Sequence, residues 1–143
     1  MKKDDIFVLF DKAYMEIYNK EQSKAEKKKY MNSVYKEIYK KVSKYTKEDW
    51  KGLRERLNYI YEDIIILMDK SPAHEKVQQA IEELRKYYSD SFYNCNLNMF
   101  RALGKLYIED ENFREKINQR KEGLAEFLSE AIEIYCYRSE NNE

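Results

Sequence analysis

Cys95 and His74 carry the most reactive side chains of this sequence, and together they would suit nucleophilic catalysis. His74 is the single histidine, so any Cys–His pair or Ser–His–Asp triad would have to use it. It follows Ser71 and Pro72 in the predicted first turn of a helix, where side chains are normally exposed. One histidine and two well-separated cysteines also match no ligand spacing of a metal site. The sequence therefore predicts a protein that is not an enzyme and that uses no metal ion or cofactor.

Cys95 follows the aromatic pair Phe92 and Tyr93 at a predicted helix boundary. A free cysteine is usually a small buried hydrophobe. A helix N-terminus would instead lower the pKa of the thiol and make it more nucleophilic. The residues favour the buried interpretation, and the reactive thiol is the alternative.

Aromatic side chains offer a second kind of chemistry, the enclosure of a large, flat ligand. A helical cleft lined by aromatic and methionine side chains suits a heteroaromatic compound. Asn94, Asn96 and Asn98 are placed to supply the orienting hydrogen bonds. The same aromatic residues can equally fill a core. Both interpretations apply to Trp50, Tyr88, Phe92, Tyr93, Phe100 and Tyr107.

The elements that must position these residues are predicted to be helices. A chain of 143 residues is one domain by length, and 3 Gly and 1 Pro are too few for a protein rich in turns. No stretch reaches the roughly 18 apolar residues that a membrane span requires. Two cysteines make no disulfide framework, which favours a reducing compartment. We expect an all-α, soluble, cytoplasmic protein with no membrane partner.

The clearest predicted helix starts after Thr46, whose hydroxyl pairs with Asp49 in a capping box. Tyr45 and Trp50 occupy the hydrophobic staple positions on either side of this cap. An apolar stripe at helical spacing then continues to about residue 69.

Four further helices are expected in the second half of the chain. Ser71 is the predicted cap of the first, with Pro72 as its opening residue. The next lies over 99–107, a short one is capped by Asp110, and the last follows Gly123. The pattern predicts a helical bundle.

The first third of the chain differs from the rest in charge and in apolar content. Residues 1–45 hold 12 Lys and 7 Asp or Glu, a net charge of +5, and the remainder holds 15 Lys or Arg and 20 Asp or Glu, a net charge of −5. Helices are expected over 4–20 and 30–43, with a polar run or loop over 20–29. With little large apolar area apart from its tyrosines, this third would struggle to fold alone. Its Lys and Tyr residues suit a solvated surface, with nucleic acid binding as the alternative.

The order and spacing of aromatic, Cys, Met and Gly residues over 92–125 resemble those of the TipAS antibiotic-recognition domain. The shared order is F-Y-x-C-x(3)-M-x(3)-L-G-x-x-Y-x(2)-D-x-x-F-x(3)-I-x(5)-G-L-A. The resemblance extends upstream through residues 45–50 and 67–69. It covers 45–138 well and 5–44 loosely.

This resemblance implies a globin-like bundle of helices without haem. It divides the chain into a lid segment, 1–44, that is mobile without ligand and folds over it, and an antibiotic-binding base, 45–143. Some family members capture thiopeptides through a cysteine, and the matching position here is Ala102. Two histidines common in the family are replaced by Leu84 and Phe100, which implies a more apolar cleft.

The implied function is non-covalent binding and sequestration of a small-molecule or macrocyclic peptide antibiotic. The protein would confer resistance, or act as the effector module of a MerR-type activator that alone contacts DNA. A module that binds a partner helix in the same groove is the alternative. The implied lid residues are Phe10, Tyr14, Tyr30 and Tyr35, and the implied ligand-binding residues are Trp50, Leu57, Tyr61, Leu84, Tyr88, Tyr93, Cys95, Asn96, Met99, Phe100 and Leu103.

Overall fold

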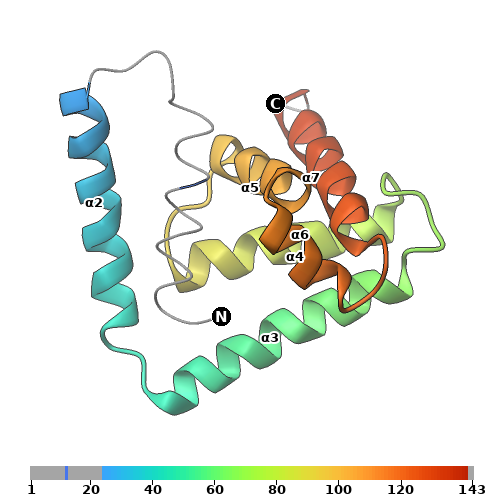
Figure 1. Ribbon diagram of the computed structural model, residues 1–143, viewed down its shortest axis with the longest axis horizontal. Helices are drawn as coiled ribbons and strands as arrows, with labels where there is room; N and C mark the ends of the chain where they lie inside the picture. The colour runs from blue at the N-terminus through green and yellow to red at the C-terminus, as the bar shows by residue number, and fades with distance from the viewer. Residues whose placement is uncertain (1–11, 13–23, 142–143) are drawn as a thin grey trace.

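The computed structural model describes residue 12 and residues 24–141, which contain six α-helices and no strand (Figure 1). This confirms the prediction of an all-α fold. None of these helices combines the length and the apolar character that crossing a membrane requires. The helices are α2 (Lys24–Val42), α3 (Lys47–Ile66), α4 (Glu75–Ser91), α5 (Leu97–Glu109), α6 (Glu111–Asn118) and α7 (Leu124–Asn141).

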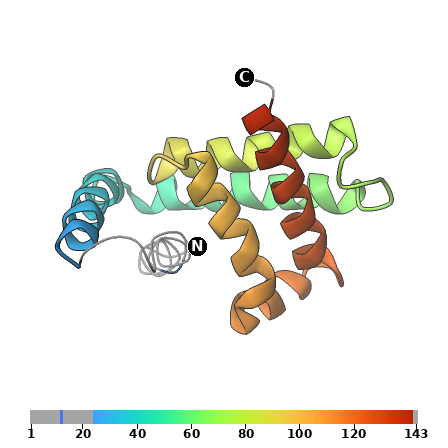
Figure 2. The ribbon, with the colours of Figure 1, turned by 90° about the horizontal axis from the view of Figure 1, so that it is seen from above.

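The bundle consists of two helix pairs laid across one another. The α3 and α4 helices lie side by side and antiparallel, while α5 and α7 form the second pair, with α6 at its far end (Figures 1 and 2). The α2 helix stands at one edge of the bundle, beside the start of α3. Short connections between consecutive helices keep neighbours in sequence next to each other in space.

The start of α3 has the predicted cap. The amide of Asp49 donates to Thr46 Oγ1 at 3.1 Å, and the amide of Thr46 donates to Asp49 Oδ2 at 2.9 Å. Tyr45 and Trp50 pack edge to face across the cap with ring centroids 5.5 Å apart. Because cap and staple fix the entry angle of the chain, this junction sets where α2 stands relative to α3.

Two helix starts differ from the prediction. The fourth helix begins at Glu75 rather than Pro72, because Ser71 Oγ accepts from the amide of Ala73 at 3.1 Å and closes a turn instead. His74 is the cap, and its Nδ1 accepts from the amide of Lys76 at 3.1 Å.

The second difference lies in the polar run over 20–29, where a loop was predicted. The α2 helix begins at Lys24, so the prediction is wrong for 24–29. This stretch contains Lys, Glu and Ala, which favour helix even without an apolar stripe. The helix predicted over 4–20 lies outside the described residues, apart from Lys12.

A close approach joins α5 and α7 at Gly104. A Cβ added there would lie 2.9 Å from Ile132 Cγ2 and 3.2 Å from its Cβ. Glycine therefore lets the two helices come closer than any side chain would allow. Gly123, with a φ of 84°, makes the turn into α7 that other residues rarely adopt.

Replacing Gly104 by alanine should therefore destabilise the fold. The added methyl group must displace Ile132, at a cost of about 1–3 kcal/mol, which exceeds the gain in helix propensity of about 1 kcal/mol. Gly52→Ala is the matched control, because Gly52 also lies within a helix and an added Cβ meets nothing within 4 Å. Urea unfolding should show a lower free energy of unfolding for Gly104→Ala and a higher one for Gly52→Ala. Equal stabilisation by both changes would contradict the close helix contact.

Candidate ligand-binding site

Three tyrosines from three helices meet in the interior. The hydroxyls of Tyr61 from α3 and Tyr107 from α5 lie 2.9 Å apart and share a hydrogen bond. Tyr107 also stacks on Phe113 of α6, with ring centroids 4.7 Å apart. The hydroxyl of Tyr88 from α4 is buried as well, and it has no hydrogen-bond partner among the described residues. We refer to Tyr61, Tyr88 and Tyr107 as the tyrosine triad.

Burial keeps the triad neutral. It raises the pKa of Tyr61 above the usual 10, and it raises the pKa of Tyr88 and Tyr107 well above it. The neighbouring phenols reinforce the effect on Tyr88 and Tyr107, because a phenolate there would face further oxygen dipoles. All three side chains therefore keep the hydrogen that a hydroxyl donates.

An aromatic row connects this triad to the start of α3. Trp50 stacks on Phe92 with centroids 6.0 Å apart, and Phe92 in turn meets Tyr87 at 5.7 Å and Tyr88 at 6.3 Å. Tyr45 donates from its hydroxyl to the carbonyl of Ser91 at 2.5 Å. The row therefore joins the junction of α2 and α3 to the end of α4.

Most of the residues predicted to bind ligand are core residues of the described structure. Trp50 and Asn96 are half-buried. The others are at most 5% exposed: Leu57, Tyr61, Leu84, Tyr88, Tyr93, Cys95, Met99, Phe100 and Leu103. A ligand would reach them only after the structure opens.

These residues do not all face one place. Trp50, Tyr61 and Tyr88 belong to the aromatic row and the triad. Phe100 instead meets Tyr135 of α7 edge to face at 5.6 Å, so it contributes to the α5–α7 contact. Of the predicted lid residues, Tyr35 is half-buried on α2, whereas Phe10, Tyr14 and the side chain of Tyr30 lie outside the described residues.

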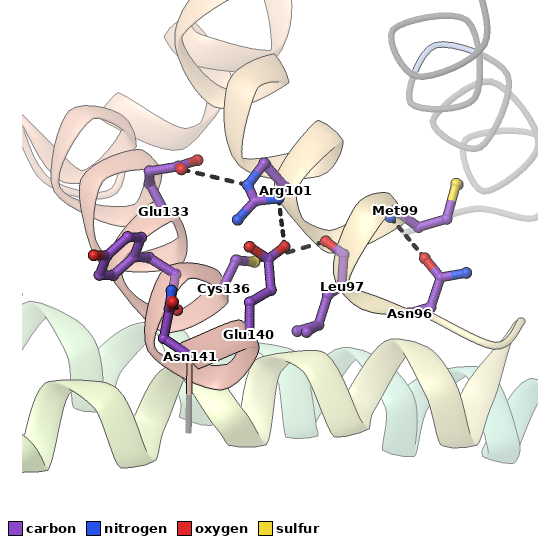
Figure 3. A network of polar contacts seen from close by, with 9 residues as sticks. Asn96, Leu97, Met99, Arg101, Glu133, Cys136, Glu140 and Asn141 are labelled. Carbon is purple, nitrogen blue, oxygen red and sulfur yellow. Dashed lines mark hydrogen bonds and ion pairs between the residues drawn. The ribbon is translucent and has the colours of Figure 1, made fainter. Parts of the chain in front are cut away.

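The predicted orienting amides are less suited to a ligand than the sequence suggests. Asn96 is the cap of α5, and its Oδ1 accepts from the amide of Met99 at 2.9 Å (Figure 3). Its acceptor therefore already serves the helix. Asn94 and Asn98 are exposed.

Cys95 is held as a buried, neutral thiol. Burial raises its pKa to about 12, although the nearby Arg85 guanidinium opposes that shift. Its carbonyl accepts from Arg85 Nε at 2.8 Å, and its amide donates to Ser89 Oγ at 3.2 Å. The structure thus favours Cys95 as a buried core residue over Cys95 as a reactive nucleophile.

A polar network fixes the start of α5 to the end of α7 (Figure 3). Arg101 reaches Glu140 at 2.7 Å and Glu133 at 3.3 Å. Beside it, Cys136 Sγ donates to the carbonyl of Leu97 at 3.7 Å. These contacts hold α5 against α7. Within the part of the chain that the structure describes, no three His, Cys, Asp or Glu side chains group as a metal site would require.

Sequence reasoning left Tyr107 out of the predicted site, although it recognised the residue as aromatic and ambiguous. Tyr61 and Tyr107 are 46 residues apart, so their hydrogen bond becomes visible only in the folded chain. The available signal was that both fall on buried helical stripes.

The fold and this interior define an all-α domain with an aromatic core and several buried hydroxyl donors. Residues 20–135 match the TipAS antibiotic-recognition domain, and the chain belongs to that family. This confirms the resemblance read from the sequence.

Two curated relatives are transcriptional activators. The HTH-type transcriptional activator mta of Bacillus subtilis is 36% identical over 141 residues, which are 99% of this chain and 55% of the relative. The HTH-type transcriptional activator TipA of Streptomyces coelicolor is 33% identical over 101 residues, 69% of this chain and 40% of the relative. The chain therefore spans about half the length of these relatives.

A solved structure shares the fold. TipAS from Streptomyces lividans, in complex with nosiheptide, superposes with a TM-score of 0.68 over 97% of this chain and 96% of that one, at 23% identity. This likeness supports the globin-like helical arrangement.

Both thiols should resist alkylation in the folded protein. Burial raises the pKa of Cys95 to about 12 and that of Cys136 to about 11, so the thiolate is scarce near neutral pH. Iodoacetamide labelling followed by mass spectrometry should be slower than for a free thiol by a factor on the order of 100 or more, and it should become fast in denaturant. A Cys136→Ala variant assigns the signal to Cys95. Rapid native labelling of Cys95 would restore the reactive interpretation.

Proposed function

We propose that this chain is a ligand-recognition domain that binds and sequesters an antibiotic, or a similar heteroaromatic or peptide compound, without a covalent bond. The observation that carries the proposal is the family match over residues 20–135, together with a core of aromatic rings and neutral hydroxyls. Such a core encloses flat, weakly polar compounds by stacking and by a few hydrogen bonds. Binding rather than catalysis is the role that this chemistry serves.

The non-covalent mode is supported by the thiols. Ala102, at the position of the family's capturing cysteine, is a buried methyl group. Cys95 is buried and protonated. Neither position offers a thiolate to an electrophilic ligand.

The biological role that we propose follows the relatives. Because they are HTH-type transcriptional activators, the domain would act in the cytoplasm as the effector module of a MerR-type activator, or alone as a resistance protein that holds the compound. DNA contact would come from an attached DNA-binding domain.

Residues 1–44 are the proposed lid and residues 45–143 the proposed base. Two described contacts support this division. Lys12 forms an ion pair with Asp110 at the α5–α6 junction, and this pairing is the main reason that the pKa of Asp110 is lowered. Lys41 Nζ donates to the carbonyl of Ser89 at 3.2 Å. Both contacts are polar and partly exposed, so breaking them costs little. Val34, Ile38 and Val42 of α2 are buried in the core, so separation of the front third must also expose apolar surface.

A separable lid would convert ligand binding into a change of shape. A ligand shifts the equilibrium only by its difference in affinity for the open and closed forms. Ordering a segment of this size consumes about 2–5 kcal/mol of the gross binding energy. The large aromatic area of the base is the source of that energy.

The ligand-binding residues proposed from the sequence remain proposals, and their support differs. Trp50, Tyr61 and Tyr88 have the firmest support, because they belong to connected aromatic surfaces. Phe100 and Asn96 have less, because each already has a structural partner.

Nosiheptide should bind the full chain, and its affinity should depend on the presence of residues 1–44. Isothermal titration calorimetry should show at least a tenfold weaker affinity when residues 1–44 are deleted, because the ligand loses one wall of its enclosure. The helical circular dichroism and melting of the 45–143 fragment serve as the folding control. Unchanged affinity in a folded fragment would favour the alternative, a groove that binds a partner helix.

A further inference from the structure

The Tyr88 hydroxyl is an anomaly in the core. Its side chain is 0% exposed, yet its oxygen finds no hydrogen-bond partner among the described residues. Buried hydroxyls are nearly always paired, because an unpaired one loses its bonds to water without replacement. The free protein therefore bears a cost at this position that phenylalanine would avoid.

The surroundings hold the Tyr88 ring in place. Tyr87 meets it edge to face at 5.3 Å, and Phe92 lies against it at 6.3 Å. Its hydroxyl lies near those of Tyr61 and Tyr107, where it partly offsets the rise in their pKa values that burial causes. It nevertheless completes a hydrogen bond with neither.

Not all of the hydroxyl hydrogens of the triad are used in hydrogen bonds. Each hydroxyl carries one hydrogen, and the 2.9 Å bond between Tyr61 and Tyr107 uses one of the three. The hydrogen of Tyr88, and that of whichever tyrosine accepts in this bond, therefore have no partner among the described residues, where side chains of α3, α4 and α5 meet. Such unused, fixed donors suit an acceptor that the free chain does not provide.

We propose that Tyr61, Tyr88 and Tyr107 form a subsite that recognises a neutral hydrogen-bond acceptor of the bound compound, a carbonyl oxygen or an azole nitrogen. This inference rests on the proposed function. It transfers the orienting role from the asparagines near the start of α5 to the tyrosine hydroxyls.

We infer a neutral acceptor because the guanidinium that the structure places beside the triad already has a partner. Arg120 lies over the Tyr61 ring, 5.0 Å from its centroid, and donates to Asn58 Oδ1 at 2.7 Å. A carboxylate placed against three phenols in this interior would be buried without a counter-charge, which is strongly unfavourable.

The Tyr88 hydroxyl should contribute to affinity because it is buried without a partner in the free protein. Its oxygen is closed to bulk solvent, so a ligand acceptor would satisfy a donor that the described residues leave unpaired. Since the triad is closed to solvent, the compound enters only after an opening step, and association is slower than diffusion allows.

Tyr88→Phe tests the subsite, with nosiheptide as the probe for calorimetry on the full chain. The dissociation constant should rise about tenfold, while the melting temperature of the free protein stays the same or rises. Tyr59→Phe is the control. It removes the same atom from a tyrosine of α3 that is 73% exposed and lies outside both the triad and the aromatic row, and it should leave the affinity unchanged.

The outcomes separate the subsite from the proposed function. If the wild type binds nosiheptide and Tyr88→Phe binds equally well, the triad subsite is wrong and the function stands. If the wild type binds neither nosiheptide nor other thiopeptides, both are overturned. A lower melting temperature for Tyr88→Phe would show that the hydroxyl has a structural partner, which also overturns the subsite. Tyr61→Phe should lower both affinity and melting temperature, because Tyr61 serves the fold as well.

Discussion

The close contact between Gly104 and Ile132 is the constraint on which the rest of this structure depends. It brings α5 against α7 at a distance that side chains would prevent. The position of α5 then places Tyr107 opposite Tyr61 of α3 and sets the direction of the segment that carries Cys95. Arg101 holds the same helix pair from the outer side through Glu133 and Glu140. A single residue without a side chain thus determines where the buried hydroxyls of the core can meet.

The interior combines tight apolar packing with several buried polar hydroxyl groups. The core gains stability from apolar and aromatic burial, which favours side chains without oxygen. It nevertheless buries five tyrosines almost completely: Tyr61, Tyr87, Tyr88, Tyr93 and Tyr107. Natural cores give up some stability at functional positions, and under the proposed subsite the unpaired hydroxyl of Tyr88 would be such a position.

The sequence predicted those features that depend on local chemistry. The Thr46–Asp49 cap, the Tyr45–Trp50 staple, the Asp110 cap and the turn at Gly123 all arise within a few residues, and the structure has each of them. The start of α4 was misplaced, because Ser71 can cap a helix or close a turn, and only the position of His74 decides between them. The orienting groups were sought among asparagines because polar residues near a helix start suggest recognition. Long-range packing instead joins hydroxyls from separate helices, and no local pattern encodes that meeting.

The buried thiols have a consequence for how such a sensor behaves under stress. Cys95 and Cys136 are closed to solvent and protonated, so peroxide and electrophilic metabolites find no thiolate to attack. Oxidation would otherwise add polar oxygen to a sulfur within the core and loosen the helix pair beside it. We therefore expect these two thiols not to couple the fold of the domain to the redox state of the cell. A response to the proposed ligand would then not depend on the oxidation of Cys95 or Cys136.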